Sequence, residues 1–337
     1  MLLLLACAGL AVAHWVRDPE RLMLDDAARL ITPLVERTLL GGELQPIAAE
    51  CLAAEAPELG GTLEISGTVD EESGGYGGVA YLAERGYFSP SRVQHVIIPE
   101  PLNVDRVCIG HRGVWWAEIE TLGRIAHGSM PFLGDSAIRH MGAVLERLET
   151  ELLPRLNARE TAMPVVPLAA RHSTLNINSI HGGPGEHHAG LPAPCVVDSC
   201  RAVIDRRFLI EESIASVKQE IVDLLNGLKQ DRTGFSYRLR DLFEVLPTMT
   251  DPDSAVVRAT CDAIAEILGR DATIVCSPGT YDQKHIDRIG RLRECIAYGP
   301  GILDLAHQPD EYVDIDDLVN SAKVMAQAAY RLLAGAA

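Results

Sequence analysis

Carboxylates stand directly after two apolar, strand-like segments of this chain. TLEISGTV (62–69) leads into Asp-Glu-Glu at 70–72, and HVIIPEP carries Glu100 between the two prolines at its end. His307 lies further on, in a His-Gln-Pro-Asp-Glu stretch. Carboxylates and a histidine from strand ends are the ligand types of zinc and related divalent cations, and an adjacent free carboxylate can act as a general base. Acidic loops are also common as solvated surface, so the pattern alone supports both a metal site and an exposed turn.

The elements that would position these residues alternate between strands and helices at both ends of the chain. Strands are expected from runs of apolar and β-branched residues, and helices from apolar residues at three- and four-residue spacing. The expected strands cover 62–69, 95–101, 273–277 and 295–301, and the expected helices cover 47–56, 79–86, 254–268 and 314–333. Such alternation favours an α/β domain built from the two chain ends. The apolar segment Leu2–Val12 is best explained as its first buried strand, because a secretory signal would carry basic residues before the apolar run.

The middle of the chain has a different pattern. Half-exposed strands and two amphipathic helices follow one another in the order β-α-β-β-α-β, which is that of a ferredoxin-like split βαβ unit. The expected strands are GVWWAEIETLG, STLNINSI, VDSCRAVIDRRFLI and FSYRLRDLFEVL, and the expected helices cover 135–156 and 211–228. We therefore expect a ferredoxin-like domain at 107–246, inserted between the two parts of the α/β domain, 1–106 and 247–337.

Several motifs occur in a fixed order over residues 47–335: GTVDEESGG, VIIPEP, RIAHGSMP, AVIDRR, PGTYD and GPGILDLAHQPDEYV. In combination they resemble the M20 metallopeptidase group, and within it the acetylornithine deacetylase and succinyl-diaminopimelate desuccinylase type. The resemblance implies a dinuclear zinc amidohydrolase, with cobalt or manganese as alternative ions. It also implies a catalytic α/β domain with an inserted lid or dimerisation domain, a homodimer formed through that lid, and a role in amino-acid biosynthesis. The expected substrate is a small N-acyl amino acid or a related compound.

The same resemblance assigns roles to five residues at the expected catalytic centre. Glu71 would be the general base that activates the attacking water. Glu72 and His307 would bind one metal ion, and Glu100 the other. His127, in the insert, would reach the active site of the partner subunit and stabilise the oxyanion. A loop histidine without a role is the alternative for His127.

Four further residues are expected to bind substrate. By the resemblance, Arg207 would hold the substrate carboxylate as a bidentate fork, and Gly279 and Thr280 would form part of the substrate cradle. Asn176, on a predicted strand of the insert, is included with them. The structural alternatives are an ion pair between Arg207 and Asp205 and a plain strand-edge role for Asn176. Tyr281, Asp282 and His285, which follow the Gly-Thr pair, are candidates for shaping specificity.

The front of the chain departs from the family pattern. Relatives carry Gly-His-x-Asp after the first strand and later an Asp that bridges the two metals, whereas this chain has ACAGLAVAH and VERTLLGGELQPIAAE (35–50). Without a bridging carboxylate, two dications at short separation repel strongly. Two explanations account for the atypical segment 1–46: a shifted reading frame over about residues 6–46, or true divergence. In the second case the chain would be a catalytically impaired homologue that acts as a binding or dimerisation protein.

Composition limits the partners and the compartment. The 30 Lys and Arg against 47 Asp and Glu give a formal net charge of −17, which a nucleic-acid backbone would repel. The eight cysteines form no Cys-x-x-Cys pair, as is typical of thiols in a reducing cytosol. The apolar N-terminal segment is too short to span a bilayer. The sequence thus predicts a cytoplasmic enzyme that binds neither nucleic acid nor membrane.

Overall fold

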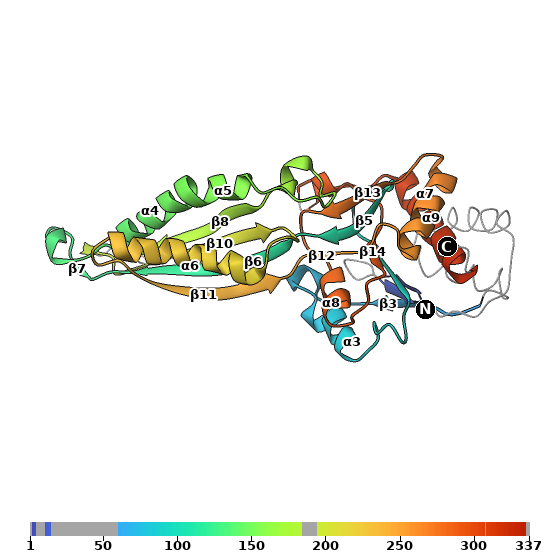
Figure 1. The fold of residues 1–337 in the computed structure, drawn as a ribbon, viewed down its shortest axis with the longest axis horizontal. Helices are drawn as coiled ribbons and strands as arrows, with labels where there is room; N and C mark the ends of the chain where they lie inside the picture. The colour runs from blue at the N-terminus through green and yellow to red at the C-terminus, as the bar shows by residue number, and fades with distance from the viewer. Residues whose placement is uncertain (1, 5–10, 15–59, 184–193, 307, 335–337) are drawn as a thin grey trace. The chain divides into compact units, whose positions relative to one another are not determined.

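A computed structural model of the chain describes residues 2–4, 11–14, 60–183, 194–306 and 308–334 (Figure 1). The chain divides into two compact units, Met1–His111 with Thr248–Ala337, and Arg112–Pro247. The first division falls five residues later than the sequence suggests, since strand β5 (Arg106–His111) belongs to the sheet of the first unit. Among the described residues, no helix combines the length and the apolar character needed to cross a membrane.

The first unit contains a mixed sheet in the order β12-β5-β14-β4-β1-β3-β2, with β13 also paired to β5. Besides β5, its strands are β1 (Leu2–Leu4), β2 (Ala11–His14), β3 (Leu63–Gly67), β4 (His95–Ile98), β12 (Thr248–Met249), β13 (Thr273–Ser277) and β14 (Cys295–Ala297). Strand β1 runs parallel to both β3 and β4, and β14 runs parallel to β4. The carboxyl ends of β3, β4 and β14 therefore lie at the same edge of the sheet.

Helices α3 (Tyr81–Glu84), α7 (Ala255–Leu268), α8 (Gln283–Arg288) and α9 (Ile315–Ala334) belong to this unit. Helices α7 and α9 pack against each other (Figure 1). The buried face of α7 is built from apolar residues such as Val256, Val257 and Ile264. The helix ends at Gly269, whose φ of 66° is the left-handed conformation that favours glycine. The helix expected over 79–86 is a π-helical turn, Tyr76–Ala80, followed by α3.

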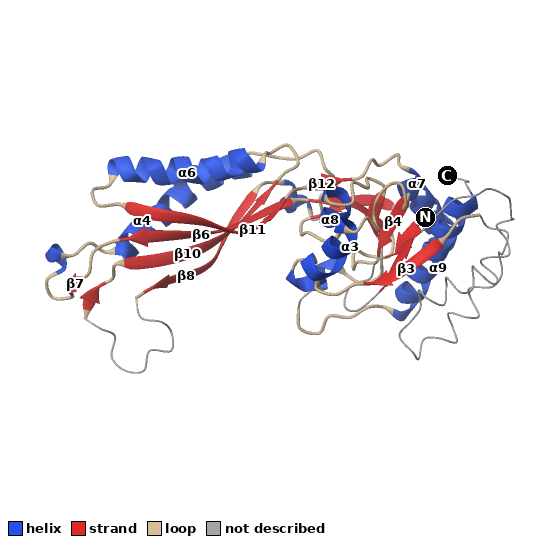
Figure 2. Cartoon of the chain, turned by 90° about the horizontal axis from the view of Figure 1, so that it is seen from below, coloured by secondary structure: helices blue, strands red, loops and turns tan. Residues whose placement is uncertain are grey.

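The second unit has four long strands and two main helices, β6 (Gly113–Leu122), α4 (Ala137–Arg147), β8 (Thr174–Gly182), β10 (Ser199–Phe208), α6 (Ile214–Asp231) and β11 (Ser236–Val245). Figure 2 shows the sheet, whose order is β11-β6-β10-β8 with every neighbouring pair antiparallel. Helix α4 continues through a π-helical turn (Leu148–Leu152) into α5 (Leu153–Asn157). A small ribbon pairs β7 (Ala126–His127) with β9 (Cys195–Val196).

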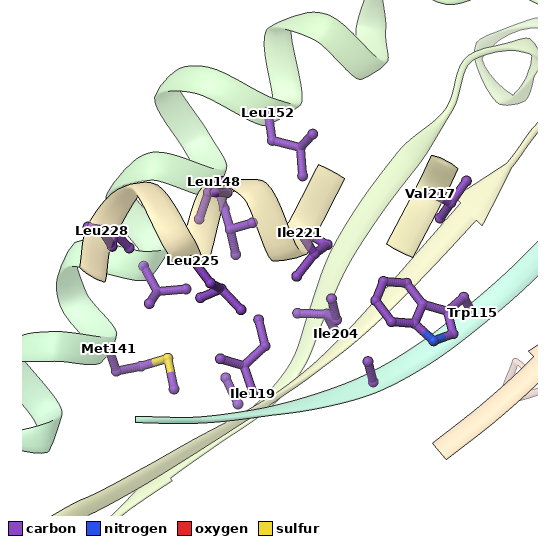
Figure 3. Close-up of a cluster of buried hydrophobic side chains, with 14 of the residues drawn as sticks. Trp115, Ile119, Met141, Leu148, Leu152, Ile204, Val217, Ile221, Leu225 and Leu228 are labelled. Carbon is purple, nitrogen blue, oxygen red and sulfur yellow. The ribbon is translucent and has the colours of Figure 1, made fainter. Parts of the chain in front are cut away.

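Alternation along the strands separates the two faces of this sheet. Trp115 and Ile119 of β6 are buried against the apolar stripe of α6, which includes Ile221 and Leu225 (Figure 3). Trp116 and Glu118, which alternate with these buried residues along β6, lie on the opposite face of the sheet. The helices thus cover one face, and the other carries charged residues such as Glu118 together with the neighbouring rings of Trp116 and Phe243.

Candidate active site

The acidic turn, residues 70–74, follows β3 and is shaped by Asp70. Asp70 has a φ of 70°, and its backbone oxygen accepts a hydrogen bond from the Gly75 N–H at 2.6 Å. Its carboxylate Oδ2 accepts a second one from the Gly77 N–H at 2.8 Å. One oxygen of the Asp70 carboxylate thereby holds the backbone that follows the turn. Glu71 is half-buried and Glu72 is exposed, and both lie in the short 3-10 helix that the turn contains.

Gly75 allows the chain to pass close to α8. Its φ is 76°, and a Cβ at this position would lie 2.3 Å from Asp282 Oδ1 and 3.2 Å from the His285 ring. Only glycine combines this conformation with this close approach. The Gly-Gly pair of the sequence motif therefore serves the packing of the turn against residues 282–285.

Glu100 stands at the end of β4, on the sheet edge where β3 also ends. A Cβ on Gly299, which follows β14, would lie 2.7 Å from the Glu100 carbonyl oxygen. Glycine at 299 thus lets the loop after β14 pass directly beside Glu100. That loop leads toward His307, which lies outside the described residues.

The donor set has the right chemistry for a divalent cation but is not complete in the described part of the chain. Glu72 and Glu100 supply carboxylate oxygens, which zinc accepts as ligands. Within the described ranges, no three side chains of His, Cys, Asp or Glu come together closely enough to hold a metal ion. His307 and the segment before residue 60 would have to provide the remaining ligands.

The loop with Gly279 and Thr280 leads into residues that touch the acidic turn. The Gly279 N–H donates to Ser277 Oγ at 3.1 Å, and Thr280 is half-buried. Five residues after Thr280, the His285 Nε2 lies 2.6 Å from the Gly74 carbonyl oxygen. Because a carbonyl only accepts, Nε2 carries the hydrogen. Burial lowers the pKa of His285, so the ring is neutral near pH 7.

Asp282 and Lys284 form a buried pair beside this contact, with Lys284 Nζ 3.4 Å from Asp282 Oδ1. Burial raises the pKa of Asp282, while Lys284 and His285 act in the opposite direction. The sequence had singled out Asp282 and His285 as candidates for specificity, but not Lys284. Nothing in the sequence indicates that Lys284 is buried, because a lysine between polar residues normally lies on the solvated surface.

Three of the residues predicted for the site belong to the second unit. His127 is exposed, and its Nδ1 accepts the Ser129 N–H at 3.2 Å and lies 2.7 Å from Ser129 Oγ. An accepting Nδ1 places the hydrogen of a neutral ring on Nε2. Asn176 is exposed and donates to Asn178 Oδ1 at 2.8 Å, as a polar residue at a strand surface does.

Arg207 forms the ion pair that the sequence left as its structural alternative. Its Nε lies 2.7 Å from Asp205 Oδ1, and its Nη2 lies 2.9 Å from Asp205 Oδ2. The two bonds use two of the five N–H donors of a guanidinium. The neighbouring Arg206, which no motif singled out, is fully buried and pairs with Glu212.

Comparisons with known proteins show the family to which the chain belongs. Residues 47–331 match the family described as peptidase family M20/M25/M40. Acetylornithine deacetylase from Myxococcus xanthus is 30% identical over 285 residues, 84% of this chain and 68% of that protein. Succinyl-diaminopimelate desuccinylase from Pseudomonas fluorescens strain Pf-5 is 25% identical over 327 residues, 96% of this chain and 79% of that protein.

Solved structures share the mixed α/β fold. An M20 family metallo-carboxypeptidase from Sulfolobus solfataricus superposes with a TM-score of 0.64 at 16% identity, covering 96% of this chain and 88% of that one. Human carnosine dipeptidase 1 gives a TM-score of 0.65 at 14% identity, covering 88% and 72%. With the family match spanning most of its length, the chain belongs to peptidase family M20/M25/M40.

Proposed function

We propose that this chain is a metal-dependent hydrolase that cleaves the amide bond of a small N-acyl amino acid. The observation that carries the proposal is the acidic turn. Asp70 is used to hold the backbone, while Glu71 and Glu72 follow on the same turn at the sheet edge that also carries Glu100. The similar proteins from Myxococcus and Pseudomonas are both named for removing an acyl group, which supports this substrate class.

Glu71 acts in this proposal as the general base. It takes a proton from the attacking water and passes it to the leaving amine. Glu72 and His307 would hold one metal ion, and Glu100 would hold the other. Zinc, or cobalt or manganese in its place, would supply Lewis acidity toward the acyl carbonyl and lower the pKa of water. Glu71 is half-buried, which partly shields its carboxylate from bulk solvent.

The second unit would be a ferredoxin-like lid through which two copies of the chain form a homodimer. The His127 tautomer supports a role as an oxyanion donor, because Nε2–H remains as the donor after Ser129 has occupied Nδ1. Arg207 would meet the substrate carboxylate with the donors that Asp205 does not use. Asn176, Gly279 and Thr280 would complete the substrate contacts from their respective units.

A second candidate function is a catalytically impaired homologue that acts as a binding or dimerisation protein. One observation favours it: the sequence lacks the His-x-Asp and the bridging Asp of the family pattern. Loss of ligands weakens metal binding, so such a protein would bind substrate-like molecules without turnover.

Hydrolysis by the purified full chain separates the two candidates. The assay uses a panel of N-acetyl and N-succinyl amino acids, before and after treatment with a chelator and after zinc is restored, with metal content measured in parallel. The hydrolase requires turnover that the chelator removes and zinc restores. The impaired homologue requires no turnover with any member of the panel, whatever the metal content.

A further inference from the structure

Helix α8 and the residue before it bury an unusual number of polar and charged side chains. These are Asp282, Gln283, Lys284, His285 and Asp287, each with an exposed fraction of 6% or less. Buried polar and charged groups cost free energy unless they are hydrogen-bonded or paired. So short a helix retains them only where its surroundings supply those partners.

One set of partners fixes α8 to the sheet. Gln283 Nε2 donates to the backbone oxygens of Ile109 on β5, at 3.2 Å, and Cys295 on β14, at 2.8 Å. On the same helix, Asp287 Oδ2 accepts from Thr248 Oγ1 of β12 at 2.7 Å. Three strands thus hold α8 in place.

A second set of partners reaches the acidic turn. The His285 Nε2–H donates to the Gly74 carbonyl oxygen over 2.6 Å. The ring also meets the Tyr76 ring edge to face, with centroids 5.1 Å apart. Together with the close approach of Asp282 to Gly75, these contacts hold the end of the turn against α8.

We propose that His285 is a positioning residue, which ties the acidic turn to the sheet through α8 and so sets the place of Glu71 and Glu72. The inference rests on the proposed function for what Glu71 and Glu72 do, but the tie itself rests only on contacts within the first unit. A base or ligand misplaced by about 1 Å can lose about 10²-fold in activity, so a rigid support for this turn has a direct chemical value. The Nε2–H of His285 is donated to the Gly74 carbonyl oxygen, so this nitrogen serves the tie and not proton transfer.

The first test is amide hydrogen exchange in the full chain, followed by mass spectrometry of peptides that cover residues 68–80. His285→Ala removes the donor, His285→Gln keeps an N–H donor of similar reach, and His95→Ala is the matched control. His95 is a half-buried histidine of the same unit, with Nδ1 3.1 Å from Glu294 Oε2. We expect exchange in these peptides to rise about tenfold or more in His285→Ala, as for loss of one buried hydrogen bond, and to stay unchanged in His95→Ala. His285→Gln should restore most of the protection.

The second test measures zinc affinity by titration calorimetry and, with an N-acetyl amino acid, kcat and KM. His285→Ala should weaken zinc binding about tenfold and lower kcat with little change in KM. The melting temperatures of His285→Ala and His95→Ala should be the same. The proposed role of His285 is overturned if exchange is unchanged in His285→Ala. It is also overturned if a folded His285→Gln fails to restore protection from exchange. If the unaltered chain binds no zinc and hydrolyses nothing, the proposed function fails, while the exchange result still decides the role of His285.

Discussion

Three consecutive acidic residues, which look equivalent in the sequence, have different environments in the structure. Asp70 accepts the Gly77 N–H and closes the turn, Glu71 is half-buried, and Glu72 is exposed. The sequence could indicate that a carboxylate acts here, because adjacent side chains point in different directions. It could not show which of the three serves the backbone, since that depends on the φ of 70° at Asp70.

Asp70→Ala should destabilise the first unit by about 1–3 kcal/mol, from one lost hydrogen bond and from a β-carbon in the left-handed region without a compensating side chain. Asp70→Asn keeps an acceptor oxygen and tolerates this conformation, so it should cost less than about half as much. Denaturant unfolding of both variants measures the difference. A loss below about 0.5 kcal/mol in Asp70→Ala would show that the carboxylate does not hold the turn.

Glu72→Gln should lower the zinc content of the purified chain, because an amide oxygen is a weaker ligand than a carboxylate. Glu84→Gln is the matched control, since Glu84 is an exposed acidic residue of α3 in the same unit. Metal analysis after equilibration with limiting zinc provides the measurement. A zinc content as high in Glu72→Gln as in the control would remove Glu72 from the ligand set.

At the scale of elements, apolar periodicity predicted most of what the structure contains. The strands expected at 62–69 and 273–277 and the helix expected at 254–268 are present as β3, β13 and α7. Among the elements that were missed, β5 and α8 have clear physical reasons. Strand β5 is a short run buried along nearly its whole length, which gives no alternation. Helix α8, QKHIDR, is buried although it is polar, because its partners come from distant strands that no local pattern reveals.

In the candidate site too, some features could be predicted from the sequence and others could not. The sequence placed Glu71, Glu72 and Glu100 after two strand-like segments, and the structure adds that the two strands, β3 and β4, end at the same sheet edge. Arg207 pairs with Asp205 in the structure, and its contact with a substrate carboxylate stays a prediction. His307 and the segment before residue 60 lie outside the described residues, so the rest of the ligand set stays a prediction.

A buried ion network joins elements of the second unit and sets its response to acid. Glu212 accepts from Arg206 Nη2 at 2.7 Å, from Arg159 Nη1 at 2.6 Å and from the Leu209 N–H at 2.8 Å. Burial alone would raise the pKa of Glu212, but Arg206 and these hydrogen bonds outweigh burial and lower it. A lowered pKa in the folded state contributes stability above the unfolded value of about 4.3, which is lost as pH falls through the folded pKa.

Glu212→Gln should therefore destabilise the second unit by about 3–5 kcal/mol at pH 7, since the buried Arg206 would keep only the more distant Glu220 carboxylate, at 3.7 Å, as its charge partner. The difference from the unaltered chain should shrink as pH falls below the unfolded value of about 4.3. Glu118→Gln, which removes an ion pair with the exposed Arg240, should cost less than about 1 kcal/mol. Urea unfolding at several pH values tests this. A pH-independent loss in Glu212→Gln would contradict the electrostatic account.

At the scale of the whole molecule, two units of different construction belong to one chain. The first is a mixed sheet with helices, and the second is an antiparallel sheet with helices on one face. The proposed homodimer through the second unit predicts a solution mass of about twice the 36.5 kDa of one chain. Light scattering after size-exclusion chromatography measures it. A single-chain mass at micromolar concentration would exclude a role for His127 in a partner's site.

The turnover of Glu71→Gln in the zinc-loaded full chain shows whether Glu71 is the general base of a metal-dependent hydrolase. If Glu71 is the general base, this variant should retain the zinc content of the unaltered chain and lose about 10²- to 10⁴-fold in kcat on N-acyl amino acids. Turnover within about threefold of the unaltered chain at equal zinc content would contradict the account.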